Sequence, residues 1–136
     1  MFAHKIYVGL STTYEKVITP ADSYLTKSVT IDNLMSTPAL LSTIIEISWN
    51  MLKPLIPEDY ITVVTSFRSN HFQPTLVGEK VKFTITVNNI ENNKICLSFS
   101  GTDYLGEFCN GKFEKAIVKN DKLLEAAYKR VKMWQI

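Results

Sequence analysis

One long apolar segment, placed between runs of strand-like sequence, most limits the folds open to this chain. Ala39–Lys53 is dense in leucine, isoleucine, tryptophan and methionine, and its polar residues fall three or four positions apart. This spacing predicts a helix with one narrow polar stripe and an otherwise buried surface. Thr37 is a candidate N-cap and Pro38 suits the first helical position, whereas Pro54 and Pro57 end the helix.

Strand-like sequence lies on both sides of this helix. Before it, we expect strands at Lys5–Ile18 and at the short β-branched run Lys27–Ile31. After it, four runs separated by turn residues predict an antiparallel meander with two hairpins. The four runs are Tyr60–Phe67, Lys80–Asn89, Lys94–Thr102 and Glu107–Val118. From Asp121 onward, apolar residues at helical spacing predict a short C-terminal helix.

The order of these elements predicts an α+β fold in which an antiparallel sheet wraps around one long central helix. The length of 136 residues and the hydrophobic content of 46% fit a single domain, residues 1–136, with a substantial core. A wrapped sheet leaves an edge strand and an uncovered rim, which commonly pair between subunits. We therefore expect a homodimer.

Charge and composition exclude several classes of function. The net charge of +2 and the five scattered glycines argue against nucleic-acid binding and against phosphate-binding loops. Cys96 and Cys109 lie in strand-like runs without metal-ligand spacing, so we expect reduced thiols and no metal site. No apolar run of ~20 residues and no signal-like start occur, which predicts no membrane span and a cytoplasmic protein.

The C-terminal segment is more basic than the rest of the chain. From Lys112 onward, seven basic residues stand against three acidic ones, which gives this segment a charge of +4 and the remainder −2. A solvated helix face is the simpler interpretation, and contact with the phosphates of a coenzyme is the alternative.

Three short segments together resemble a known family. Ser36-Thr37-Pro38 precedes the helix, which carries Glu46; Asn70–Gly78 contains His71 followed by Pro74-Thr75-Leu76-Val77-Gly78; and Tyr104–Glu107 leads into the last strand. The combination resembles the fluoroacetyl-CoA-thioesterase-like branch of the hot-dog thioesterases, from about Gly9 to Val118. The resemblance implies a hot-dog fold, hydrolysis of a short or medium acyl-CoA, and no cofactor beyond the coenzyme A of the substrate.

The resemblance also implies a catalytic triad of Thr37, Glu46 and His71, with Ser36, Ala39, Val64 and Gly78 near the substrate. Two positions depart from the family. Its members usually have one residue fewer between the threonine and the glutamate, and a glycine where Val64 stands. Ile31–Met35 lacks the phenylalanines that form a lid in the fluoroacetyl enzyme. We therefore expect a reshaped acyl pocket and a substrate other than fluoroacetyl-CoA.

Thioester hydrolysis needs a base or nucleophile and a site for the oxyanion. A buried Glu46 is suited to act as general base or nucleophile, and His71 is suited to move a proton. The N–H groups of Ala39 and Leu40, at the helix start, are candidate oxyanion donors.

Each of these residues also has a purely structural interpretation. Glu46 shares the polar stripe of the helix with Thr43 and Asn50, His71 ends a strand, and Thr37 suits a cap. Two other functions therefore remain open: a non-catalytic protein that binds acyl-CoA or another apolar ligand, and a hydratase or dehydratase that removes a proton beside a thioester.

Overall fold

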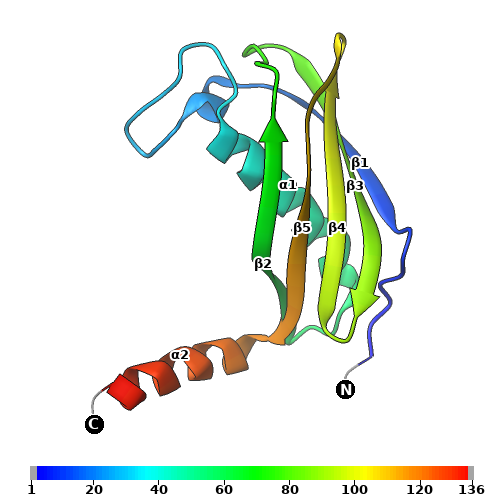
Figure 1. Ribbon diagram of the computed structural model, residues 1–136, viewed down its shortest axis with the longest axis vertical. Coiled ribbons are helices and arrows are strands. Elements are labelled where there is room, and N and C mark those ends of the chain that lie inside the picture. Colours follow the sequence, from blue (N-terminus) through cyan, green and yellow to red (C-terminus); the bar gives the residue numbers. More distant parts are fainter. Residues whose placement is uncertain (1–2, 135–136) are drawn as a thin grey trace.

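The computed structural model describes residues 3–134, which form a five-stranded antiparallel sheet with one long helix against its concave face (Figure 1). The strand order is β1-β3-β4-β5-β2, so that β1 and β2 are the two edges. The predicted fold, a sheet around one long helix with a short C-terminal helix, is confirmed. The elements are β1 (Ser11–Val17), α1 (Thr37–Leu52), β2 (Tyr60–His71), β3 (Lys80–Glu91), β4 (Lys94–Asp103), β5 (Gly106–Lys119), α2 (Asn120–Trp134), and the 3-10 turns η1 (Pro20–Ser23) and η2 (Lys53–Leu55).

Between residue 3 and α1 the structure has one strand, so the prediction of two strands before the helix was wrong. The strand predicted at Lys5–Ile18 is confined to β1. The segment Lys27–Ile31 belongs to a loop, because the N–H groups of Leu25 and Thr26 both donate to the carbonyl of Val29 and close a tight turn. A single bridge between Tyr24 and Thr30 is all the β-structure this loop forms.

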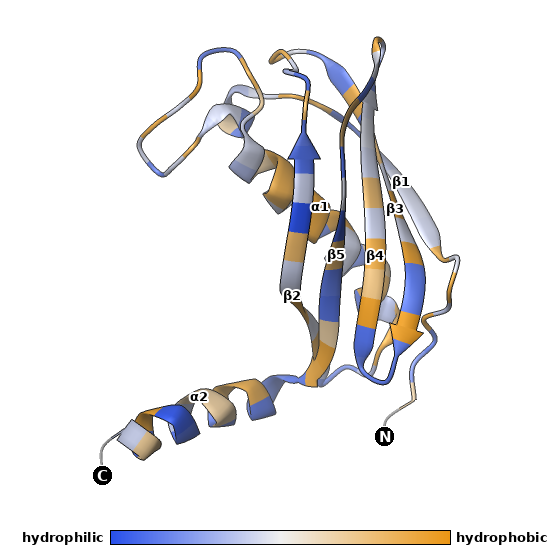
Figure 2. Cartoon of the chain, viewed as in Figure 1, coloured by the Kyte–Doolittle hydropathy of each residue, from blue (hydrophilic) through white to orange (hydrophobic). Residues whose placement is uncertain are grey.

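The core lies between α1 and the sheet. Leu40, Ile44 and Leu52 of α1 are fully buried, and they meet the alternating inward residues of the central strands. The largest fully buried apolar side chains of those strands are Phe83, Ile85, Ile95, Leu97, Phe108 and Ile117. This alternation is visible as orange segments along β3 and β4 (Figure 2).

The outer side of α1 is less buried than predicted. Ile45 and Trp49 each keep 36% of their surface exposed, although the sequence pattern predicts that apolar residues of this helix are covered. Trp49 lies beneath the β2 side of the sheet, since its ring contacts Lys115, whose strand partner is Val64. An apolar strip of α1 is therefore open beside the β2 edge.

The C-terminal helix α2 projects away from the sheet (Figure 1), and none of its described side chains is buried. It begins beside the start of β2, where the N–H of Asn120 donates to the carbonyl of Asp59. No helix within residues 3–134 has both the length and the apolar character needed to span a membrane.

Candidate active site

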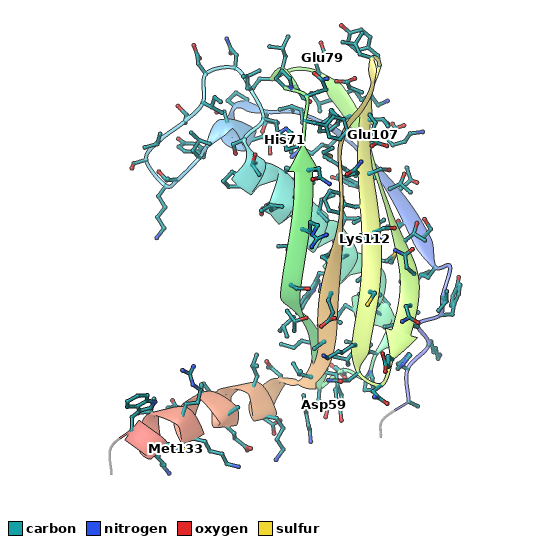
Figure 3. The ribbon with its side chains drawn as sticks, viewed as in Figure 1. Asp59, His71, Glu79, Glu107, Lys112 and Met133 are labelled. Atoms are coloured by element: carbon teal, nitrogen blue, oxygen red, sulfur yellow. The ribbon has the colours of Figure 1, made fainter. Side chains whose placement is uncertain are left out.

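The site predicted from the sequence centres on a hydrogen bond between Thr37 and His71. Thr37 is the first residue of α1 and His71 is the last residue of β2. The Oγ1 atom of Thr37 lies 2.9 Å from Nδ1 of His71. Figure 3 shows His71 at the end of β2, beside the first turn of α1. The structure thus joins two of the three predicted catalytic residues.

The segment that follows His71 fastens the end of β2 to the start of α1. The N–H of Met35 donates to the carbonyl of Thr75, and the N–H of Val77 donates to the carbonyl of Asn33. Gly78 has a left-handed φ of +97°, a conformation that favours glycine, and its N–H donates to the carbonyl of Ile18. Gly78 therefore forms the turn that returns the chain to the sheet.

Thr37 and His71 line a mostly apolar pocket of about 230 Å³. The pocket lies between the loop before α1 and the end of β2. Its other lining residues are Leu25, Ile31, Leu34, Met35, Ser36, Phe72, Gln73 and Pro74. Such a wall suits an apolar acyl chain, with the hydroxyl and the imidazole at one end.

The environment of His71 favours a neutral imidazole. Burial lowers the pKa of His71 below its usual value of 6.5. Because the Thr37 hydroxyl can donate to Nδ1, the tautomer that suits this contact carries its proton on Nε2. Nε2 is buried and has no hydrogen-bond partner among residues 3–134. A neutral histidine of this tautomer is ready to accept the proton of the Thr37 hydroxyl.

The helix start differs from the prediction. Ser36, not Thr37, is the N-cap: its Oγ accepts from the N–H of Ala39 at 3.1 Å and donates to the carbonyl of Tyr24 at 2.6 Å. The N–H of Leu40 donates to the carbonyl of Ser36. The two N–H groups predicted to bind an oxyanion are thus occupied. The N–H of Thr37, at the first helical position, has no acceptor inside the helix.

Glu46 lies away from this pair. It is exposed and lines a separate pocket beside β1, with Thr12, Tyr14 and Lys16. Nine residues along an α-helix turn the side chain by about half a revolution, so Glu46 faces the side of α1 opposite to Thr37. The position at the usual family spacing is Ile45, which is partly exposed on the β2 side. Within one chain the structure does not bring Glu46 to Thr37 and His71.

A buried lysine in β5, which lies against the middle of α1, was not predicted from the sequence. Lys115 is 1% exposed, and its Nζ donates to Oγ of Ser48 at 3.2 Å and lies 5.8 Å from the ring centroid of Trp49. Burial lowers its pKa to about 8. Lys115 pairs with Val64 next to a β-bulge in β2. The only sequence feature that could have indicated its burial is its position in β5, where apolar residues alternate with polar ones.

Residues 18–121 match the model of the family described as fluoroacetyl-CoA-specific thioesterase. The chain belongs to this family. The family is one of thioester hydrolases, so the predicted enzyme class and the suspected family are confirmed at the family level. No curated protein sequence matches the chain.

Solved structures are similar to most of the chain. A hot-dog-like protein from Thermanaerovibrio acidaminovorans is 28% identical with a TM-score of 0.83, over 90% of this chain and 91% of that one. A thioesterase superfamily member from Thermus thermophilus is 19% identical with a TM-score of 0.80, over 96% and 97%. A fluoroacetyl-CoA-specific thioesterase variant, solved with fluoroacetate and CoA, is 18% identical with a TM-score of 0.80, over 87% and 99%.

Proposed function

We propose that this protein hydrolyses short or medium acyl-CoA thioesters and that Thr37 and His71 carry the reaction. The observation behind the proposal is the 2.9 Å hydrogen bond between a hydroxyl and an imidazole at the end of an apolar pocket. A nucleophile in hydrogen-bond contact with a base is the arrangement that acyl transfer requires. Membership of a thioesterase family supports the substrate class.

The proposed reaction has two steps. In the first, Oγ of Thr37 attacks the thioester carbon while Nδ1 of His71 takes the hydroxyl proton; the carbon–sulfur bond then breaks, and His71 returns the proton to the departing sulfur. In the second, His71 accepts a proton from water, which attacks the acyl-threonine ester. The carboxylic acid leaves, the proton returns to Thr37, and the net reaction consumes one water.

The oxyanion formed in each step needs a nearby donor. The N–H of Thr37 at the start of α1 is the donor that the cap leaves available, and the positive end of the helix dipole lies there. The reaction requires no metal or redox cofactor, since coenzyme A enters only as part of the substrate. Ser36 supports this arrangement as the cap of α1, and the half-buried Ala39 and Val64 stay predicted substrate neighbours.

The catalytic role of Glu46 stays a prediction. The proposal gives the first proton transfer to His71, because Glu46 lines the pocket on the β1 side of α1. A Glu46→Gln variant separates the two ideas. Near-normal turnover would support catalysis by Thr37 and His71. Loss of turnover would instead indicate that Glu46 is the base or the nucleophile.

A homodimer through β2 belongs to the proposal. Within residues 3–134, β2 has a strand on one side only, and it is 12 residues long against 7 for the other edge strand, β1. The partly exposed Ile45 and Trp49 lie on the same side of the molecule. Antiparallel pairing of β2 with its copy would cover both the edge and this apolar strip. The predicted cytoplasmic location stays a prediction.

Binding without catalysis is the second candidate, and one observation favours it. Among the described residues, no carboxylate lines the pocket of His71, and Ile45 stands at the usual spacing of the family's glutamate. An acyl-CoA carrier or sensor would need only the apolar wall. A hydratase or dehydratase would use the same histidine as a base, and it would yield a new double bond instead of a free thiol.

Thiol release from a panel of short-, branched- and aryl-acyl-CoAs tests these alternatives. The wild-type protein is compared with His71→Ala, and Glu46→Gln serves as the matched site variant outside the pocket. Free thiol from the wild type and Glu46→Gln, with its loss in His71→Ala, would support the proposal. Acyl-CoA binding without any thiol release would contradict it and favour the binding function.

A further inference from the structure

Helix α2 has an apolar face that nothing covers within residues 3–134. Its 15 residues include none that is buried. Apolar side chains spaced three or four apart share one side, and their exposed fractions run from 45% to 86%. They are Leu123, Leu124, Tyr128, Val131 and Trp134. An isolated helix of this length is marginal in water, so a packing partner for this face would stabilise it.

The start of α2 is fixed beside the edge strand β2. Lys119, the last residue of β5, pairs with Tyr60, the first residue of β2. The N–H of Asn120 then donates to the carbonyl of Asp59, and Nζ of Lys119 lies 3.8 Å from the same residue's carboxylate. Figure 1 shows that α2 extends past β2, on the side toward which the loop before α1 also extends.

Two-fold symmetry brings this helix to the active site of the other subunit. If the whole of β2 pairs antiparallel with its copy, the axis passes near Thr65 and Ser66, and His71 lies opposite the partner's Tyr60. The partner's Lys119 is one strand further, which places it about 10 Å from His71. The partner's helix therefore begins next to the Thr37–His71 pocket.

The surface around that pocket is apolar and exposed. Tyr24, Leu25 and Val29 of the loop before α1 are 40–50% exposed, and Phe72 just after β2 is 47% exposed. Leu25 and Phe72 also line the pocket. An apolar helix face of five large side chains matches this surface in chemistry. A second copy of the chain is thus the occupant that accounts for both exposed surfaces at once.

The polar side of α2 is basic. Lys122 pairs with Glu125, but Lys129, Arg130 and Lys132 form no ion pair among the described residues. Cations at the rim of an acyl-CoA pocket would meet the diphosphate and the 3′-phosphate of the coenzyme.

We propose that α2 packs across the dimer over the loop beside the partner subunit's Thr37–His71 pocket, where its basic residues bind the phosphates of coenzyme A. The ligand and the β2 dimer that places the helix both rest on the proposed function, and the cross-link tests the dimer without any use of turnover. Each active site is then built from two subunits, and each subunit supplies the pocket of one site and the phosphate-binding helix of the other.

Cross-linking tests the position of α2 without any use of activity. On a Cys96→Ser background, Val131→Cys is combined with Val29→Cys and treated with a short bismaleimide. We expect a covalent dimer on a denaturing gel. Val131→Cys combined with Tyr14→Cys, on the far edge strand β1, is the control and should stay monomeric. A link formed only within one chain, no link at all, or binding of α2 to anionic phospholipid vesicles in place of the link would overturn the proposal.

Coenzyme A binding tests the basic residues. Titration calorimetry with coenzyme A and with pantetheine compares the wild type, Lys129→Gln/Arg130→Gln, and the matched surface control Lys80→Gln/Lys82→Gln. We expect the α2 variant alone to weaken coenzyme A binding by about tenfold or more, with pantetheine binding unchanged. Unchanged coenzyme A binding by the α2 variant would overturn the phosphate-binding role.

Mixed dimers separate this inference from the proposed function. One subunit carries His71→Ala with an intact α2, and the other has an intact pocket but ends at Lys119. The proposal predicts a wild-type KM, because the intact pocket faces the intact helix. Joining both changes in one subunit leaves the intact pocket without its helix and should raise KM. The reverse order would overturn the proposal, whereas a cross-linked dimer without turnover would contradict only the proposed hydrolysis.

Discussion

Thr37 Oγ1 lies 2.9 Å from His71 Nδ1, although 34 positions separate the two residues in the chain. The contact exists because the loop before α1 is joined to the segment after β2 by two backbone hydrogen bonds, from the N–H of Met35 to the carbonyl of Thr75 and from the N–H of Val77 to the carbonyl of Asn33. The pair is thus held by rigid elements, which is what a reacting hydroxyl and its base require.

The pH dependence of turnover follows from the burial of His71. Burial lowers the pKa of its imidazole below 6.5, so the neutral, proton-accepting form persists at pH values where an exposed histidine is charged. We expect the acid-side decline of kcat/KM to have its midpoint below pH 6.5. A decline with a midpoint above 6.5, measured with a thiol assay, would contradict a buried neutral base.

Replacing Ser36 should destabilise the protein more than replacing Thr37. Ser36→Ala removes the N-cap and the contact with the Tyr24 carbonyl, so we expect a loss of about 1–2 kcal/mol in the free energy of unfolding. Thr37→Ala removes an exposed side chain that does not cap the helix and should cost less than half as much. Urea unfolding followed by circular dichroism measures both. A larger loss for Thr37→Ala would mean that the cap is assigned to the wrong residue.

Lys115 should make stability depend on pH. Its pKa is lowered from 10.5 to about 8 in the folded state, so the cost of burying the ammonium is fully present below pH 8. Between pH 8 and 10.5 the folded protein releases this proton and the unfolded chain keeps it, which raises stability by about 3 kcal/mol in total.

Lys115→Met isolates this contribution. The variant should be more stable than the wild type at pH 7, and the difference should shrink as pH rises to 10. Chemical denaturation of both proteins at each pH cancels the titration of the other groups. A difference that does not change with pH would mean that Lys115 is not a buried cation.

The two cysteines should react at different rates. Burial, with a smaller effect from the Glu107 carboxylate, raises the pKa of the Cys109 thiol to about 12, whereas Cys96 is only partly covered. We expect maleimide to modify Cys96 in the native protein and Cys109 only after unfolding. Mass spectrometry of timed samples gives the result. Equal rates in the native state would show that Cys109 is not enclosed between the sheet and α1.

The sequence predicts most helices, strands and hairpins of this fold, because the spacing of hydrophobic residues and the turn residues determine local structure. The run of apolar residues from Ala39 and the hairpins at Glu91–Lys94 and Asp103–Gly106 are found where the pattern indicates them. The loop at Lys27–Ile31 was assigned wrongly, because β-branched residues favour strands but cannot specify a pairing partner. That partner depends on tertiary contacts, and here the loop closes on itself.

For a related reason, the sequence indicates some residues of the candidate site more clearly than others. His71 and Thr37 stand out by motif, and each lies at an element end, where the fold brings them together. The prediction for Glu46 depended on its direction around α1, and a shift of one residue turns a helical side chain by about 100°. Lys115 left no clear signal, since a single cation in an apolar strand is usually placed outward.

The most direct test of the central claim is single-turnover thiol release by Thr37→Val, Thr37→Ser and His71→Ala, with coenzyme A affinity measured on the same samples. If Thr37 and His71 carry the reaction, the rate falls by about 10²–10⁴-fold in Thr37→Val and His71→Ala and survives in part in Thr37→Ser, while coenzyme A binding stays within twofold. Near-wild-type rates in Thr37→Val and His71→Ala would contradict the claim and move the chemistry away from this pair.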